Sequence, residues 1–402
     1  MKRFFAAFIV ILLVTGCVTK KSTDVYTVVV SLDAFLWDYP ALCQTPNLDS
    51  IAAKGVRCVM EPSYPASTFP NHYTIATGLV PDHHGIVNGS FWCPETGKKY
   101  SMSDSLVRYN PDYYLGEPIW VTAEKARVTT ASIYWVGSDV AIKDTYPTHY
   151  FVWDRPRLSY EERADEAVRL LSLPEDQRPR LVMVYIDDPD MTSHAYGPDA
   201  PETKAMVERL DSLMGSLYRK LMSLPIADKI NLIVTADHGM TEISPERFVN
   251  IRDYVKEDWC EYVIGSAPTN IYTKGNCADS VYQALVGVEH ISVWKHGAVP
   301  EEYNYGTSNR TGDVIVAPDL GWQFGFSPRT LKGAHGFSPK EKDMQVSFTA
   351  VGPSFKAGYW CDTVAFKNID IYPMLADILG ITPAKTDGKL ENTKSCSCST
   401  QA

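Results

Sequence analysis

Residues 26–32, Tyr-Thr-Val-Val-Val-Ser-Leu, form a nearly continuous apolar run that ends directly at Asp33. Two later runs have the same form and also end in acidic residues: Leu181–Ile186 before Asp187, Asp188 and Asp190, and Asn231–Ala236 before Asp237 and His238. Runs of this character are typical of strands in a parallel sheet that is covered on both faces. The three runs therefore predict a buried parallel sheet whose strands end in acidic side chains.

Helical patterns alternate with these runs and with two strand-like runs that lack a terminal acid. The helical patterns cover Pro46–Lys54, Ile119–Lys125, Tyr160–Leu173, Glu202–Leu224 and Ile369–Leu379, and the two further runs cover residues 129–135 and 346–351. Alternation of this kind predicts an α/β fold with a central, mostly parallel sheet and helices on both faces. Ligands in such folds bind at the carboxyl ends of the strands. One Asp at such a place is usually a helix cap or turn residue, but three strands that end in this way favour a common site.

The length and composition predict one large domain over residues 25–390. A weaker pattern over about residues 244–321 predicts a smaller inserted subdomain. The polar residues 391–402, which include Cys396 and Cys398, predict a flexible tail. The formal charge of −10 argues against a basic face that binds a nucleic acid duplex.

Residues 1–16 predict a cleaved export signal. Lys2 and Arg3 precede the apolar run Phe4–Val14, which is too short to span a bilayer. Cys17 follows directly after small residues, as in bacterial lipoprotein signals, and an ordinary secretory signal is the alternative. We expect a lipid on Cys17, a tether over residues 17–24, and an exported, membrane-anchored protein on the periplasmic side or at the cell surface. Such a location permits disulfides, whose pairing the sequence does not define.

The stretch Ser67-Thr-Phe-Pro-Asn-His-Tyr73 predicts the start of a helix. Pro70 suits an early helical position because its missing N–H costs little there. A helix start favours anions, so the hydroxyl of Thr68 is a candidate nucleophile toward phosphorus. No general base lies nearby in the sequence, which favours activation by a metal ion. The alternative is that Thr68 only caps the helix.

Candidate metal ligands of oxygen and nitrogen type lie in several short stretches. Asp190 and His194 are four residues apart and would face the same way on a helical turn. Other candidates are Asp33, Thr68, Asp237, His238 and His335, the last between glycines in Gly333-Ala-His-Gly336. Mixed carboxylate and imidazole ligation without sulfur suits zinc, with manganese or iron as alternatives. The amide of Asn88 is a candidate donor to a phosphoryl oxygen.

The remaining histidines have no comparable partners in the sequence. We expect these residues to be structural or to lie at the surface: His72, His83, His84, His149, His290 and His296.

Taken together, these stretches are similar to the motifs of one family. The matching segments, in order, are Ser31–Phe35, Thr68–Tyr73, His84–Asn88, Gly116–Lys125, Trp135–Asp139, Pro189–Asp190 with His194 and Gly197-Pro198, Asp237–Met240 and Gly333–Gly336. The chain resembles the nucleotide pyrophosphatase/phosphodiesterase family of the alkaline phosphatase superfamily, from about Tyr26 to Gly388. The resemblance implies an alkaline-phosphatase-like core and a two-zinc enzyme that hydrolyses nucleotide phosphodiester or pyrophosphate bonds to nucleoside monophosphates.

The resemblance also implies roles for individual residues. Thr68 would form a covalent nucleotidyl intermediate that water then hydrolyses, and Asn88 would hold the phosphoryl oxygen. One ion would be held by Asp33, Thr68, Asp237 and His238, and the other by Asp190, His194 and His335. Phe69 and Tyr185 would sandwich the base of a nucleotide, and Trp135 would flank the same pocket. The alternative is that Tyr185 is only a buried strand residue and Phe69 only packs at the helix start.

Two departures from the family pattern are present: Gly336-Phe-Ser-Pro339 after His335, and the acids Asp187 and Asp188 before Pro189. They leave every candidate ligand in place and bear on substrate choice. The rival interpretations are a phosphocholine-, phosphonate- or monoester-cleaving relative and a non-catalytic, lipid-anchored binding protein. A monoesterase would need extra positive charge, and no Arg or Lys lies beside Thr68 in the sequence. The expected partner is a small nucleotide or phosphodiester, with membrane contact only through the lipid.

Overall fold

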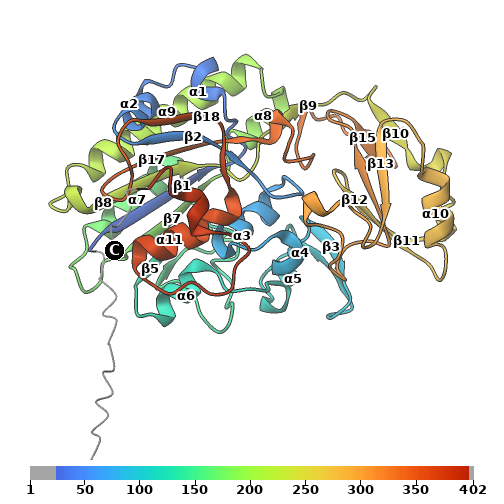
Figure 1. The fold of residues 1–402 in the computed structure, drawn as a ribbon, viewed down its shortest axis with the longest axis horizontal. Coiled ribbons are helices and arrows are strands. Elements are labelled where there is room, and N and C mark those ends of the chain that lie inside the picture. The colour runs from blue at the N-terminus through green and yellow to red at the C-terminus, as the bar shows by residue number, and fades with distance from the viewer. Residues whose placement is uncertain (1–23, 398–402) are drawn as a thin grey trace, which may run out of the picture.

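The computed structural model describes residues 24–397. The predicted signal and nearly all of the predicted tether lie outside these residues. An eight-stranded sheet forms the centre of the molecule, in the order β18-β2-β17-β8-β1-β7-β5-β6 (Figure 1). Its strands are β1 (Tyr26–Leu32), β2 (Val56–Glu61), β5 (Thr130–Ile133), β6 (His149–Tyr150), β7 (Leu181–Ile186), β8 (Ile230–Thr235), β17 (Val346–Val351) and β18 (Tyr359–Lys367).

Only β17 runs against its neighbours in this sheet, and the other neighbouring pairs are parallel. This confirms the predicted mostly parallel sheet. All residues of β1, β7 and β8 are buried, as their continuous apolar character predicts. Ser31 of β1 lies opposite Tyr185 of β7 and Thr235 of β8. The carboxyl ends of these three adjacent strands therefore meet at one edge of the sheet.

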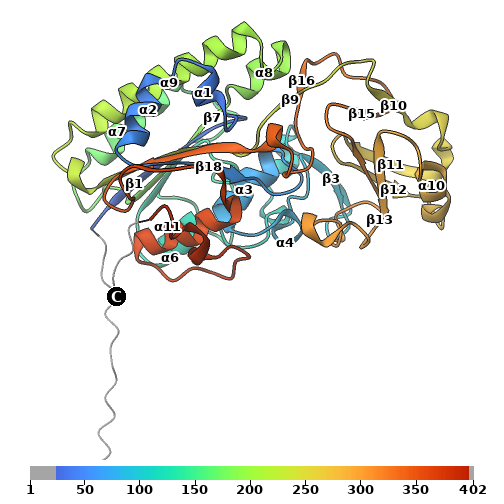
Figure 2. The same ribbon diagram turned by 45° about the horizontal axis from the view of Figure 1, so that its top comes forward.

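Helices cover both faces of the sheet (Figure 2). One face carries α1 (Tyr39–Leu42), α2 (Pro46–Ala53), α7 (Tyr160–Leu171), α8 (Asp190–Tyr196) and α9 (Pro201–Leu221), and the other carries α3 (Thr68–Thr77), α4 (Pro81–His84), α6 (Ile119–Lys125) and α11 (Ile371–Leu379). In α9, the buried residues Val207, Leu210, Met214, Leu217 and Leu221 recur at helical spacing. This apolar stripe packs the helix onto the layer below it.

The predicted elements and the observed elements differ mainly at their ends. The helix predicted to follow Thr68 begins at Thr68 itself, and Ser67 occupies the position before it. The strands β2 and β18 were not predicted. In β18, several residues are exposed and the pairing with β2 is interrupted by two irregularities, so the segment lacks the continuous apolar run of a buried strand.

A smaller unit with its own core lies at one end of the molecule (Figures 1 and 2). Its four-stranded antiparallel sheet has the order β11-β12-β14-β13. The elements of this unit are β10 (Phe248–Asn250), β11 (Cys260–Gly265), β12 (Thr269–Thr273), α10 (Ala278–Leu285), β13 (Ile291–Lys295), β14 (Val314–Pro318) and β15 (Gln323–Gly325). Ile271, Val281, Leu285 and Phe324 belong to its separate hydrophobic core. We call residues 248–325 the insert; the sequence predicted a subdomain over about residues 244–321.

Several shorter elements lie outside the central sheet and the four-stranded sheet of the insert. They are β3 (Ser90–Cys93), β4 (Lys98–Ser101), α5 (Ser105–Arg108), β9 (Thr241–Glu242) and β16 (Gly333–Ala334). The strands β9 and β16 pair with each other on the two sides of the insert. None of the helices within residues 24–397 combines the length and the apolar character needed to cross a membrane.

The C-terminal segment is packed against the sheet as far as residue 397. Cys396 is fully buried, its carbonyl accepts a 3.1 Å hydrogen bond from the N–H of Lys356, and Ser397 forms a β-bridge with Phe355. The side-chain amide of Asn392 donates to the carboxylate of Asp370. These contacts replace the flexible tail that the polar composition predicts for residues 391–397, because burial of Cys396 and specific hydrogen bonds hold the segment. Cys398 lies beyond the described residues.

Candidate active site and metal centre

Three buried carboxylates follow the strands that meet at one edge of the sheet. Asp33 directly follows β1, Asp237 follows β8, and Asp190 begins α8 just after β7; they are 1%, 0% and 8% exposed. The backbone supports this arrangement: the N–H of Asp190 donates to the carbonyl of Asp33 at 3.1 Å, and the N–H of Ala34 donates to Oδ1 of Asp237 at 3.3 Å. The fold thus brings together acids that are far apart in the sequence.

Three histidines surround these carboxylates, and the Nδ1 atom of each faces a backbone carbonyl. Nδ1 of His238 lies 2.8 Å from the carbonyl of Gly239, and Nδ1 of His194 lies 2.8 Å from the carbonyl of Gly333. Nδ1 of His335 lies 3.2 Å from the carbonyl of Ala66. Because a carbonyl can only accept, each Nδ1 carries the proton. A neutral imidazole then offers the lone pair of Nε2, which is the form that binds a metal ion.

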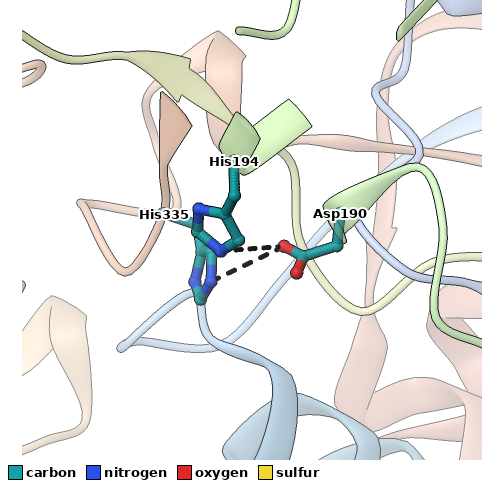
Figure 3. A group of neighbouring side chains, drawn as sticks. All are labelled: Asp190, His194 and His335. Atoms are coloured by element: carbon teal, nitrogen blue, oxygen red, sulfur yellow. Dashed lines mark ion pairs between the residues drawn. The ribbon is translucent and has the colours of Figure 1, made fainter. Parts of the chain in front are cut away.

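The Nε2 atoms point to carboxylate oxygens that have no hydrogen-bond partner. Nε2 of His238 lies 3.1 Å from Oδ2 of Asp237 and 3.4 Å from Oδ1 of Asp33. Nε2 of His194 and of His335 lie 3.4 Å and 3.7 Å from Oδ1 of Asp190, and Figure 3 shows both rings directed toward that carboxylate. All three of these oxygens are buried without a hydrogen bond. Such atoms are costly to bury unless a cation binds them, so the site fits a metal ion.

The pKa shifts within the cluster also favour a bound metal ion. Burial, and then the neighbouring carboxylates of Asp237 and Asp190, raise the pKa of Asp33 well above its usual range. Burial and the charge of Asp237 likewise raise the pKa of Asp190. Burial, together with His238 and His194, lowers the pKa of His335 well below its usual value. A divalent cation would offset the cost of burying these groups, because it stabilises ionised carboxylates and binds neutral imidazoles. The absence of sulfur in this cluster suits zinc, manganese or iron.

The donors form one continuous cluster. The described residues include three groups in which the donor atoms lie within 4.8 Å of one another. The groups are Asp190 with His194 and His335, Asp33 with Asp190 and His238, and Asp33 with His72 and Asp237. Asp190 therefore belongs to two groups, and the rings of His238 and His335 stack with centroids 3.8 Å apart. The structure brings the six predicted carboxylate and imidazole ligands into this cluster. Their role as ligands and their division between two ions stay predictions.

Thr68 lies at the edge of this cluster. It is the first residue of α3, and its Oγ1 is 3.1 Å from Nε2 of His238. The chain thus presents a hydroxyl at the amino end of a ten-residue helix, beside the donors that can bind cations. This position is favourable for a hydroxyl that attacks an anionic group.

His72 belongs to this site, although the sequence did not predict it there. His72 is completely buried, and its Nδ1 lies 2.9 Å from the carbonyl of Thr68 and 3.3 Å from Oδ2 of Asp237. Its Nε2 lies 2.9 Å from Oγ of Ser31. The expectation that His72 lacks partners comparable to those of the ligands is therefore wrong. The available signal was its spacing, because a residue four positions after Thr68 lies one turn along the same helix.

A cleft of about 480 Å³ opens next to Thr68. Its lining includes the predicted base-binding residues Phe69, Trp135 and Tyr185. Trp135 is 1% exposed and donates from Nε1 to the carbonyl of His72 at 2.9 Å, so its indole also supports α3. Tyr185 is 7% exposed and donates from its hydroxyl to Oδ2 of Asp33 at 2.6 Å. The cleft therefore joins an aromatic wall to the candidate metal-binding cluster.

Residues 27–338 match the model of the family described as type I phosphodiesterase / nucleotide pyrophosphatase. The chain belongs to this family. It is 31% identical to human ectonucleotide pyrophosphatase/phosphodiesterase family member 5 over 369 residues, which cover 91% of this chain and 76% of that protein. It is also 31% identical to human family member 1 over 382 residues, but these span only 40% of the length of that larger relative.

Solved structures of the same family share the fold. The structure of murine member 5 matches with a TM-score of 0.88 and 29% identity over 93% of this chain and 100% of that chain. The α/β architecture that the sequence predicts is therefore confirmed for this family member. The predicted membership of the nucleotide pyrophosphatase/phosphodiesterase family is also confirmed.

Two features of the site were not predicted from the sequence: the contribution of Trp153 and Arg157 to the cleft, and the contact of Asn88 with the insert. Trp153 also lines the cleft, with the guanidinium of Arg157 over its ring at 4.4 Å and an ion pair between Arg157 and Asp187 at 3.3 Å. Asn88, the predicted donor to a phosphoryl oxygen, uses its amide Nδ2 to bind the carbonyl of Pro268 at 3.3 Å. Since Pro268 lies between β11 and β12, the insert helps to orient Asn88.

Proposed function

We propose that this protein hydrolyses nucleotide phosphodiester or pyrophosphate bonds and releases nucleoside monophosphates. The observation that carries the proposal is the position of the Thr68 hydroxyl, 3.1 Å from Nε2 of His238 and between the buried carboxylates and an aromatic cleft. Family membership makes phosphorus chemistry the expected reaction. The aromatic cleft favours a substrate that carries a flat ring, such as a nucleobase.

The proposed cofactor is a pair of zinc ions, with manganese or iron as alternatives. Asp33, Thr68, Asp237 and His238 would hold one ion, and Asp190, His194 and His335 would hold the other. The buried carboxylate oxygens without hydrogen bonds and the proton-free Nε2 atoms support this assignment. Bound in this way, the ions would lower the pKa of the Thr68 hydroxyl and offset the negative charge of the phosphoryl group.

The chain supplies the nucleophile and the orientation of the substrate. Oγ1 of Thr68, after loss of its proton, attacks phosphorus and forms an O–P bond while the bond from phosphorus to the leaving oxygen breaks. Water then cleaves the resulting nucleotidyl-threonine and restores the hydroxyl. The amide of Asn88 has a second N–H besides the one directed at Pro268, and this N–H is proposed to bind a phosphoryl oxygen.

The base is proposed to stack between Phe69 and Tyr185, with Trp135 beside it. Support comes from a related structure, that of an inactive threonine-to-alanine variant of murine member 5 in complex with AMP, which is 28% identical to this chain. In that structure a threonine has been replaced in an inactive protein, which agrees with the role proposed for Thr68. The bound nucleoside monophosphate agrees with the role proposed for the cleft.

The charges of the cleft favour a diester over a phosphate monoester. The cleft contains two arginines, and each is paired with an acid: Arg108 with Asp154 at 2.6 Å and Arg157 with Asp187 at 3.3 Å. A monoester dianion would need unpaired positive charge near the nucleophile, whereas the attacked phosphoryl group of a diester or of a nucleotide pyrophosphate carries a single negative charge. The arrangement therefore disfavours a monoesterase.

A side-by-side rate assay tests the function. Protein that begins after residue 17 is supplied with zinc and given the nitrophenyl ester of a nucleoside monophosphate, nitrophenyl phosphate or nitrophenyl phosphocholine, and Thr68→Ala is the matched control. We expect a strong preference for the nucleotide ester. Preference for the monoester or for phosphocholine would replace the proposed substrate class. A protein that binds zinc but turns over none of the three would favour a binding function.

For the location, we propose an exported lipoprotein that is held to a membrane through Cys17. The support is the sequence pattern of residues 1–17 and the names of the relatives, which describe ectonucleotide enzymes. Growth with a tagged fatty acid should label the wild type but not Cys17→Ser. Equal labelling of the two proteins, or no labelling of either, would contradict the lipid anchor.

A further inference from the structure

Two buried cysteines meet where the C-terminal segment packs on the central sheet. Cys58 on β2 is 2% exposed and Cys396 is 0% exposed. Their sulfur atoms lie 3.8 Å apart although 338 positions separate the residues in the sequence. We propose that Cys58 and Cys396 form an intramolecular disulfide that fastens the C-terminal segment to β2. This inference does not depend on the proposed activity, but it uses the proposed export of the chain.

The backbone on both sides of the pair is already held in place. In the sheet, Cys58 lies opposite Phe348 of β17 and Cys361 of β18. On the other side, the carbonyl of Cys396 accepts from the N–H of Lys356 at 3.1 Å. The ammonium group of Lys356 also donates to the carbonyls of Lys394 and Ser395. A disulfide needs a sulfur separation of about 2 Å, so the two sulfurs, which lie 3.8 Å apart, have to move closer for the bond to form.

Cys361 is the competing partner, because it is the neighbour of Cys58 across the sheet. Its Sγ, however, lies 3.3 Å from both the carbonyl and the hydroxyl of Thr363, and the residue is partly exposed. Cysteine clusters can also bind metal ions, but within residues 24–397 the groups of donors close enough to share an ion contain no cysteine. The geometry therefore favours the pair of Cys58 and Cys396.

The bond can form by exchange with an external disulfide, either of a thiol–disulfide oxidoreductase or of oxidised glutathione. The thiolate of Cys396 attacks one sulfur of that disulfide and releases the first external thiol. The sulfur of Cys58 then loses its proton and attacks Sγ of Cys396, which releases the second. Two electrons and two protons pass from the cysteine pair to the oxidant.

Burial sets the time at which the bond can form. Both sulfurs are inaccessible in the folded protein, so the exchange has to occur before the C-terminal segment docks. An exported chain folds in a compartment that supplies such an oxidant. The bond would connect residues beyond the family match, which ends at 338, to the strand that precedes Thr68.

Peptide mapping of the full protein tests the pairing directly. The protein is produced with its own leader so that it folds outside the cytoplasm, free thiols are alkylated, and the chain is digested without reductant. We expect one linked peptide pair that contains Cys58 and Cys396 and is lighter than the reduced peptides by two hydrogen atoms. Alkylation of both residues in most of the sample, or a link from Cys58 to Cys361, would overturn the proposal.

Thermal unfolding of variants provides an independent readout. Wild type that is unfolded in denaturant with a phosphine reductant and refolded in its presence should have an unfolding midpoint about 3–6 °C below that of the protein treated without reductant, because the cross-link restricts the unfolded chain. Cys396→Ser should start from the lower midpoint and show no response to reductant. Cys361→Ser is the matched control and should respond as the wild type does. Equal midpoints for wild type with and without reductant, or loss of the response in Cys361→Ser, would contradict the assigned pair.

Discussion

The hydroxyl of Tyr185 donates a 2.6 Å hydrogen bond to Oδ2 of Asp33, while Oδ1 of the same carboxylate has no hydrogen-bond partner and lies 3.4 Å from Nε2 of His238. The phenol thus fixes the orientation of Asp33 and leaves its other oxygen directed into the metal-binding cluster. Since the ring of Tyr185 also lines the cleft, one side chain links the proposed base pocket to the proposed metal centre.

Replacement of Tyr185 by Phe separates these two roles. The ring remains, so we expect KM for a nucleotide nitrophenyl ester to stay close to that of the wild type. The hydrogen bond to Asp33 is lost, so zinc affinity should fall by about tenfold or more, as is typical when a group that orients a metal ligand is removed. Zinc titration and steady-state kinetics at saturating zinc measure the two effects. Unchanged zinc affinity would show that Tyr185 does not orient Asp33.

Replacement of Tyr185 by Ala should remove the stacking surface as well. Base stacking is worth about 1–3 kcal/mol, so KM for the nucleotide ester should rise by about 5- to 150-fold relative to Tyr185→Phe. A small diester without a base serves as the control substrate, and its KM should be the same in the two variants. An equal increase for both substrates would refute stacking on Tyr185.

Removal of the Thr68 hydroxyl should abolish turnover but not metal binding. We expect Thr68→Ala to lower kcat by about a thousandfold or more, because no other hydroxyl takes the place of Oγ1. Thr68→Ser keeps a hydroxyl at the start of α3 and should retain a substantial part of the activity. Zinc content and the unfolding midpoint establish that both variants are folded. Activity of Thr68→Ala close to that of the wild type would exclude the covalent mechanism.

Neutralisation of Asp190 should have opposite effects on the metal-free and the metal-loaded protein. Burial and the nearby carboxylate of Asp237 raise the pKa of Asp190, so its charged form destabilises the metal-free fold at neutral pH. Asp190→Asn should therefore raise the unfolding midpoint in a chelator by about 2–4 °C. With zinc the order should reverse, because the variant has lost a ligand. A lower midpoint for the variant in both conditions would argue against a metal site.

The same pKa shift gives a pH test of the metal-free protein. A carboxyl whose pKa is raised by folding favours the folded state below its ordinary pKa of about 4, and this contribution is lost as the pH rises toward the folded value. In chelator, the midpoint advantage of Asp190→Asn over the wild type should thus be larger at pH 7 than at pH 4. An advantage that does not change with pH would not come from the charge of Asp190.

His72 should act as a positioning residue, because it contacts the carbonyl of Thr68, the carboxylate of Asp237 and the hydroxyl of Ser31. His72→Asn can keep a donor near the position of Nδ1, whereas His72→Gln places its amide near the position of Nε2. We expect zinc affinity and kcat to fall less in His72→Asn than in His72→Gln. His84→Asn replaces another buried histidine, which contacts Thr74, and should leave zinc affinity unchanged. Equal zinc affinity in all three variants would limit His72 to packing.

The sequence predicts the part of the fold in which local pattern and tertiary environment agree. Strands β1, β7 and β8 are buried on both faces, so their apolar runs are continuous and their ends are marked by acids. Strand β18 has the opposite character. Trp360 and Val364 on it are exposed, and the pairing with β2 is irregular, so no simple period marks it.

Some residues of the site can be predicted from the sequence, whereas some of the contacts between them cannot. Asp33, Asp190 and Asp237 can be predicted because parallel strands end at one edge of a sheet. The contact between His72 and Asp237 depends instead on how α3 packs against β1 and β8, which no local pattern encodes. The hydrogen bond from Asn88 to Pro268 spans 180 positions and depends on the docking of the insert. Long-range packing of this kind is specified by the whole chain, so the structure was needed to find it.

The insert lies between ligands in the order in which the chain is made. Asp237 and His238 precede residues 248–325, and His335 follows them. A ribosome that has just completed His238 has made most of the central sheet but not the donor set, and it must still translate the entire insert before His335 exists. The proposed metal centre can therefore be completed only after the whole insert has been made.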